Sequence, residues 1–220
     1  MNYRPINHYL LLADLFVYPI EELRFKTENA QKFLDGHYPT AAKYLAEFTS
    51  IINSIPLRQW EEIYTRSFDV QALTTLDAGY VLFGDDYKRG ELLVNLNNEH
   101  KKTNNDCGTE LADHLPNLLR LLVRVNDDDF KNDLIFLIII PALKKIIGEF
   151  ENEKIHKKND IYEKHHKTLI TQEENNGKAY KWPLLALLEV LTSDFQENHS
   201  GMIDGTTFSH EISNELKIQS

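Results

Sequence analysis

Apolar residues recur along this chain at intervals of three and four positions, the spacing that places side chains on one face of an α-helix. Leu76, Tyr80 and Phe83 follow this interval, and we expect a helix that buries them. Further stripes of the same period are Tyr9, Leu12, Ala13 and Phe16; Tyr44, Leu45, Phe48, Ile51, Ile52 and Ile55; Trp60, Ile63, Tyr64 and Phe68; Leu92, Leu93 and Leu96; and Leu115, Leu118, Leu119 and Leu122. The pattern predicts an all-α, multi-helix fold with short connections.

Prolines, glycines and acidic residues separate these stripes. Pro39 is expected in the first turn of a helix, and Pro56 between that helix and the next, because proline lacks the amide hydrogen of a helix interior. Gly84 should end the helix that carries Phe83, since a glycine readily adopts the positive φ of a helix end. Asp85 or Asp86 should then cap the following helix. The boundaries therefore support the helical interpretation.

The most apolar run covers residues 134–140 and is rich in β-branched side chains. It lacks a hairpin partner, so a buried helix is preferred over a strand, with a kink or interruption at Pro141. It is also too short to span a bilayer, and the amino terminus shows no secretory signal. We expect a protein of the cytoplasm that does not insert into the membrane.

The length of 220 residues suits one domain, which we expect over residues 1–198. Residues 151–179 are polar and are predicted to form an insertion or an exposed helix extension, and residues 199–220 a disordered polar tail. With 34 acidic and 24 basic side chains the net charge is −10, which argues against nucleic acid as a partner and favours a basic one. The lone Cys107 excludes an internal disulfide.

Two polar segments, residues 75–90 and 113–116, have the character of a recognition surface. Lys88 and Arg89 occupy the first turn of a helix, the unfavourable end of its dipole for cations, and so require a partner. Asp85 or Asp86 could supply it, or a bound anionic or carbonyl-rich group could. We expect Asp113 to cap the next helix and His114 to face outward toward the Gly-Asp turn. The alternatives are a surface turn whose charges pair with one another and a cap without a ligand.

The run Leu-x-x-Gly-Tyr-x-Leu-Phe-Gly-Asp-Asp-x-Lys-Arg-Gly at residues 76–90 resembles the central motif of the NarJ-type chaperones, the nitrate reductase delta subunit family related to TorD and DmsD. Tyr-x-x-x-Phe-Asp at residues 64–69 and Asp-His-Leu-Pro at 113–116 are similar to further motifs of that family, although Ala112 stands where the family usually has proline. Residues 180–188 are similar to the segment that opens its last core helix. The strong similarity covers residues 57–125.

This resemblance implies a maturation chaperone without catalytic activity or a permanently bound cofactor. Its partner would be the catalytic subunit of a molybdenum enzyme of the dimethyl sulfoxide reductase superfamily, bound through its amino-terminal, twin-arginine peptide. The chaperone would hold this client open for insertion of molybdopterin guanine dinucleotide and delay its export, and it could form a homodimer. Groove-wall candidates are Tyr64, Phe68, Tyr80 and Phe83; candidates for polar and charged recognition are Asp69, Asp85, Asp86, Arg89, Asp113 and His114.

Two other classes of function stay open. One is a small helical metal-dependent hydrolase that uses His100, His114 and acidic neighbours, although the sequence has no His-Glu-x-x-His or Cys-x-x-Cys motif, and the adjacent His165 and His166 would point apart on a helix. The other is a structural adaptor subunit that stays in its complex. The client, among nitrate, nitrite, selenate, chlorate and hydrocarbon oxidoreductases, is not identified by the sequence.

Overall fold

The computed structural model describes residues 6–151 and 176–195, and every regular element in these two ranges is helical. The elements are α1 (His8–Ala13), the 3-10 helix η1 (Asp14–Phe16), α2 (Glu22–His37), α3 (Pro39–Ser54), α4 (Leu57–Phe68), α5 (Ala78–Phe83), α6 (Tyr87–Lys102), α7 (Leu115–Arg124), α8 (Asp128–Asp133), the π-helical η2 (Leu134–Ile139), α9 (Ile140–Glu149), the 3-10 helix η3 (Asn176–Lys178) and α11 (Lys181–Phe195). The all-α prediction is confirmed.

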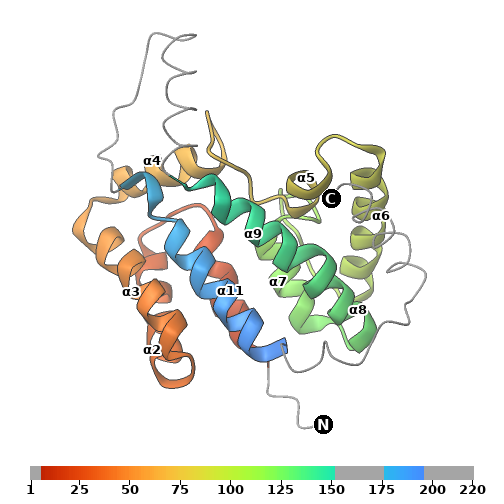
Figure 1. Cartoon of the computed structure of the whole chain (residues 1–220), viewed down its shortest axis with the longest axis horizontal. Coiled ribbons are helices and arrows are strands. Elements are labelled where there is room, and N and C mark those ends of the chain that lie inside the picture. Colours follow the sequence, from red (N-terminus) through yellow and green to blue (C-terminus); the bar gives the residue numbers. More distant parts are fainter. Residues whose placement is uncertain (1–5, 152–175, 196–220) are drawn as a thin grey trace.

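The last described helix lies at the centre of the molecule. Figure 1 shows α11 between α3 on one side and α9 on the other, and it packs against both. α2 packs on α3, and α1 packs on α7. The helices α5 and α6 lie beyond α9, at the edge of the molecule away from α3 (Figure 1), and α5 contacts α9 directly. The core contains large side chains that are almost wholly buried, among them Trp60, Tyr180, Phe48 and Phe150.

The predicted helix boundaries are largely confirmed. Pro39 is the first residue of α3, and Pro56 directly precedes α4. Gly84 follows α5 with a φ of 65°, a backbone conformation that glycine adopts without steric cost. Of the two candidates, Asp86 is the N-cap residue of α6, because its carboxylate accepts a hydrogen bond from the Lys88 amide at 3.0 Å.

The helix predicted for the run at residues 134–140 continues through Pro141, and its geometry changes from π to α immediately before the proline. The π-helical η2 leads directly into α9, and Pro141 is the second residue of α9. A π-helical turn is wider than an α-helical turn, and this makes room for a proline ring that would otherwise clash with the carbonyl four residues earlier. The burial prediction for this run is confirmed at Leu134, Ile135, Ile138 and Ile139, each at most 1 % exposed.

The predicted apolar stripe around α5 is partly wrong. Leu76 is buried, but it lies before the helix, and Tyr80 is 43 % exposed. α5 instead buries Ala78, Gly79 and Leu82. The pattern misled because Leu76 does not share a continuous helix with Tyr80, so the interval between them does not define one face.

The predicted insertion at residues 151–179 lies mostly, and the predicted tail at 199–220 wholly, outside the described residues. In the ranges 6–151 and 176–195, helices that combine the length and apolar character needed to cross a bilayer are absent.

Candidate functional site

The segment between α4 and α5, residues 69–77, folds back along the end of α4. The amides of Leu73 and Thr74 donate hydrogen bonds to the carbonyls of Arg66 and Ser67, each at 3.1 Å. The chain reverses at Gln71, which adopts a φ of 51°, and the side-chain oxygen of Gln71 accepts a hydrogen bond from Arg66 at 3.0 Å. This folded linker forms one wall of an open pocket.

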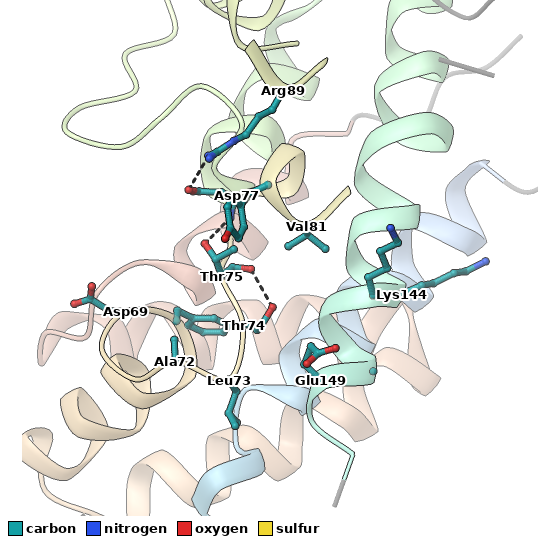
Figure 2. Close-up of a pocket in the computed structure, with 14 residues that line it drawn as sticks. Asp69, Ala72, Leu73, Thr74, Thr75, Asp77, Val81, Arg89, Lys144 and Glu149 are labelled. Carbon is teal, nitrogen blue, oxygen red and sulfur yellow. Dashed lines mark hydrogen bonds and ion pairs between the residues drawn. The ribbon is translucent and has the colours of Figure 1, made fainter. Parts of the chain in front are cut away.

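The pocket has a volume of about 810 Å³ and lies between the linker, α5 and the carboxyl-terminal half of α9. Figure 2 shows Asp69 and Lys144 on opposite sides of it, with Thr75 and Val81 between them. Its lining residues are Phe68, Asp69, Ala72, Leu73, Thr74, Thr75, Asp77, Tyr80, Val81, Arg89, Lys144, Lys145, Gly148 and Glu149. The lining combines apolar and charged side chains, and the site is large enough for a peptide segment or a small molecule.

Four of the ten predicted site residues line this pocket: Phe68, Asp69, Tyr80 and Arg89. Sequence reasoning missed its opposite wall, formed by Lys144, Lys145 and Glu149 on α9. These residues follow the central motif by more than fifty positions and belong to no motif of their own. Only the packing of α5 against α9 brings them to the site.

A polar network that includes the lining residues Asp77 and Arg89 joins the two predicted motif segments. The Arg89 guanidinium donates through Nε to Asp113 Oδ2 at 3.0 Å and through one terminal nitrogen to Asp77 Oδ2 at 3.0 Å. His114 Nδ1 lies 3.1 Å from Asp77 Oδ1. The Asp113 side chain is fully buried, and the Arg89 side chain is 14 % exposed. Two buried or half-buried carboxylates are thus held around one guanidinium, an arrangement in which each charge is compensated.

The backbone reinforces the same junction. The Ala78 amide donates to the Asp113 carbonyl and the Leu115 amide to the Leu76 carbonyl, both at 2.9 Å. A Cβ atom on Gly79 would lie only 2.7 Å from Asp113 Oδ2, so the close approach of α5 to residue 113 requires a glycine. The two motif segments therefore pack directly against each other.

The roles expected for individual residues in this junction need correction. The Arg89 guanidinium forms its ion pairs with Asp113 and Asp77 rather than with Asp85 or Asp86. Asp113 is buried by that pairing, and its side chain does not cap α7, whose N-cap residue is His114. His114 is 9 % exposed and turns toward Asp77 rather than outward. Asp113 and His114 therefore support the site from below, and the sequence pattern could not distinguish this from surface exposure.

The ionisation of the network follows from these contacts. Burial opposes the charged form of Asp77, but the hydrogen bond and charge of His114, together with Arg89, hold the pKa of this carboxyl below its usual value. Burial likewise opposes the Arg89 charge, whereas Asp113 and Asp77 raise the pKa of the guanidinium above its usual value. Asp77 and Arg89 are consequently charged at neutral pH.

The remaining predicted residues lie outside the pocket. Tyr64 is a core residue: its hydroxyl donates to the Phe16 carbonyl at 3.2 Å, and its ring packs edge-on against Phe68 and Tyr180. Burial raises the pKa of Tyr64 well above its usual value. Phe83 is half-buried against the core, and Asp85 and Asp86 are exposed. The aromatic wall predicted from four residues thus reduces, at the pocket, to Phe68 and Tyr80.

Tyr80 holds its exposed position next to Arg89. The Arg89 guanidinium carbon lies 5.2 Å from the centre of the Tyr80 ring, within the range of a cation–π interaction. The same guanidinium is fixed by Asp113 and Asp77, so its position restricts the ring above it. An aromatic side chain held at the edge of an open pocket presents apolar surface to a ligand at little cost in conformational entropy.

His100, a candidate in the hydrolase hypothesis, serves in the packing of the loop that leads to Asp113. Its Nε2 donates to the Ala112 carbonyl at 3.0 Å, and its Nδ1 accepts from Asn105 at 2.8 Å. Burial lowers the pKa of this imidazole below its usual value, which favours the neutral form. Among the described residues, no group of three histidine, cysteine, aspartate or glutamate side chains is arranged to hold a metal ion.

Comparisons with known proteins do not assign the chain to a family: neither the protein-family models nor the curated proteins include one that matches it.

Proposed function

We propose that this protein is a maturation chaperone for a molybdenum-containing oxidoreductase and acts in the cytoplasm on the client's catalytic subunit. The observation that carries the proposal is the pocket of about 810 Å³, whose linker and α5 walls are built from the segments that resemble the NarJ-type motifs. Phe68, Asp69, Tyr80 and Arg89 come from three different helices or their ends and still meet at this one opening.

The pocket suits a short segment of a protein partner. Phe68, Leu73, Tyr80 and Val81 offer apolar surface along its floor and edge, and Asp69 offers a carboxylate at one side. A client amino-terminal peptide of the twin-arginine kind would place apolar side chains in the pocket and a basic side chain at Asp69. The net charge of −10 would draw such a basic segment toward the chaperone.

The chaperone would act by occupancy rather than by catalysis. While the peptide is bound in the pocket, the export machinery cannot bind it. The client then stays open for the insertion of molybdopterin guanine dinucleotide. The Arg89 network would contribute by keeping the two motif segments in one fixed arrangement. In this proposal Asp85 and Asp86 belong to the α6 cap and its turn, and Asp113 and His114 support the site without touching the peptide.

Capture of partners in the cells that naturally make the protein tests this proposal. A tagged wild-type chain should recover a molybdopterin oxidoreductase catalytic subunit that lacks its cofactor, as measured by mass spectrometry and molybdenum analysis. The Tyr80→Ala variant should recover several-fold less, because it removes the aromatic edge of the pocket. Tyr87→Ala is the matched control, since Tyr87 is 78 % exposed and does not line the pocket.

Three results would count against the proposal. If the captured proteins include no molybdopterin oxidoreductase subunit, the proposed client is wrong. Recovery of a mature, cofactor-loaded complex would favour a permanent adaptor subunit. Equal recovery by Tyr80→Ala and Tyr87→Ala would place the contact elsewhere on the surface.

A further inference from the structure

The charged residues around the pocket are not evenly distributed. Arg89 and Asp77 bind each other, with Asp113 and His114 completing their network. The α9 wall of the pocket carries two lysines, Lys144 and Lys145, and one carboxylate, Glu149. Among the described lining residues, a ligand therefore meets the carboxylate of Asp69 on one side and an α9 wall with a net positive charge on the other.

The geometry separates these charges by an apolar surface. Asp69 is the exposed residue at the end of α4, and Figure 2 shows Lys144 across the pocket from it, on α9. Lys144 and Lys145 are both exposed, and the Lys145 ammonium donates a long hydrogen bond of 3.5 Å to the Leu82 carbonyl of α5, which holds it beside the pocket. Val81 lies between the two sides (Figure 2), and Phe68 and Tyr80 also line the pocket. The pocket thus has an acidic end, a middle lined by apolar and threonine side chains, and an end with a net positive charge.

We infer that the pocket selects a peptide segment of a protein partner that carries both signs of charge, with a basic residue toward Asp69 and an acidic residue toward Lys144 and Lys145. The inference deepens the proposed function and rests on it in taking a peptide as the occupant. It adds two requirements that the family resemblance does not contain: an acidic residue in the bound segment and a single direction of binding. A reversed peptide would bring its acid to Asp69 and its base to the lysines, so like charges would repel at both ends.

The two ends should act independently on affinity. Exposed ion pairs are weak, so each should change the dissociation constant by about two- to fivefold, with smaller effects at high salt. Apolar contacts in the middle should supply the larger part of the affinity and be indifferent to salt. Charge therefore determines which peptides bind and in which direction, and the apolar floor determines how tightly they bind.

Selection from a random 12-residue peptide library displayed on phage tests this without knowledge of the client. Peptides enriched on the wild-type chain should contain an apolar centre flanked by a basic residue on one side and an acidic residue on the other. The Lys144→Glu/Lys145→Glu variant should enrich peptides with a basic residue in place of the acidic one. The control Lys43→Glu/Lys101→Glu changes net charge equally at two exposed lysines outside the pocket, and it should enrich the wild-type pattern.

One enriched peptide is then resynthesised in acidic, neutral and basic versions, and binding is measured by fluorescence anisotropy. The wild type should prefer the acidic version, and Lys144→Glu/Lys145→Glu should prefer the basic version. The inference is overturned if Lys144→Glu/Lys145→Glu and Lys43→Glu/Lys101→Glu change the peptide preference to the same extent. It is also overturned if the enriched peptides are purely apolar.

The outcome is separable from that of the proposed function. If a client is recovered from cells and its binding does not change in the Lys144→Glu/Lys145→Glu variant, the chaperone function is supported and the charge-selective pocket is refuted. If the peptide preference is as expected but no molybdenum enzyme is recovered from cells, the peptide site is supported and the proposed client is refuted.

Discussion

Three glycines of the central motif illustrate how one residue type can serve different physical needs. Gly84 has a positive φ after α5, whereas Gly79 and Gly90 lie inside helices. A Cβ at Gly79 would meet Asp113 Oδ2 at 2.7 Å and Leu92 Cδ2 at 3.0 Å, but a Cβ at Gly90 would meet nothing within 4 Å. The sequence predicted the role of Gly84, but only the structure distinguishes Gly79 from Gly90.

Gly79→Ala should therefore destabilise the protein, although alanine is the better helix former by about 1 kcal/mol. The added methyl group must displace a buried carboxylate that Arg89 holds in place, and we expect the free energy of unfolding to fall by about 1–3 kcal/mol. Urea denaturation followed by circular dichroism measures this change. Gly90→Ala is the matched control and should raise the free energy of unfolding by up to about 1 kcal/mol. A stabilising Gly79→Ala would show that Asp113 does not hold α5 at this distance.

At the scale of elements, Arg89 connects α6 with the linker before α5 and with the loop before α7. The Asp113 side chain is fully buried, and Arg89 is the cation that forms an ion pair with it. We predict that Arg89→Leu lowers the free energy of unfolding by about 3–5 kcal/mol, because it leaves a buried carboxylate without its cation. Arg89→Leu/Asp113→Leu should lose less than the single variant, since both charges are removed together.

Urea denaturation of both variants and of Lys101→Leu, an exposed residue of the same helix α6, provides the comparison. Lys101→Leu should change the free energy of unfolding by no more than about 0.5 kcal/mol. If the double variant is less stable than Arg89→Leu, the network contributes more than charge compensation. The double variant also keeps the prediction testable should Arg89→Leu fail to fold.

The helices themselves were predictable because their signals are local. Pro39, Gly84 and Asp86 act within one turn of their own positions, and each marks the boundary that it was expected to mark. Contacts between elements were not predictable in the same way. The partner of Arg89 is Asp113, 24 residues further on, and the exposure of Tyr80 depends on which face of α5 meets the rest of the molecule. A periodic sequence pattern predicts neither the ion-pair partner of Arg89 nor the exposure of Tyr80.

The same limit applied to the candidate site. Phe68, Asp69, Tyr80 and Arg89 were found because they lie in motifs, whereas Lys144 and Lys145 lie next to a long apolar run with no chemical signal of their own. Asp113 was assigned to the surface because charged residues are usually exposed. Its burial follows from the glycine at position 79, and the distance between these two residues is a tertiary property.

At the scale of the whole molecule, a second buried carboxylate joins the two ends of the described chain. Asp194 in α11 accepts hydrogen bonds from the hydroxyls of Tyr9 at 2.8 Å and Tyr38 at 2.6 Å, and from His8 Nε2 at 2.9 Å. Its side chain is 6 % exposed. α1, the junction of α2 with α3, and the end of α11 are thus connected through one residue, and neither Asp194 nor its three partners line the pocket.

Asp194→Asn should lower the free energy of unfolding at pH 7 by about 1.5–3 kcal/mol, the range for hydrogen bonds to a charged group. The difference from wild type should depend on pH. Burial opposes the charged form, but the hydrogen bonds from His8, Tyr38 and Tyr9 prevail and lower the pKa of Asp194 in the folded protein. The stabilisation is therefore complete above the unfolded-state value of about 3.9 and is lost as the pH falls through the lower, folded-state pKa.

Urea denaturation at several pH values between 7 and 3 tests both the size and the direction of this effect. The gap between wild type and Asp194→Asn should be constant near neutrality and close at the acidic end, because protonation removes from the wild type the same charge that the substitution removes. Asp85→Asn makes the same chemical change at an exposed position and should leave stability within about 0.5 kcal/mol of wild type throughout. A gap that persists unchanged to pH 3 would mean that the shape of the side chain, rather than its charge, joins α11 to α1.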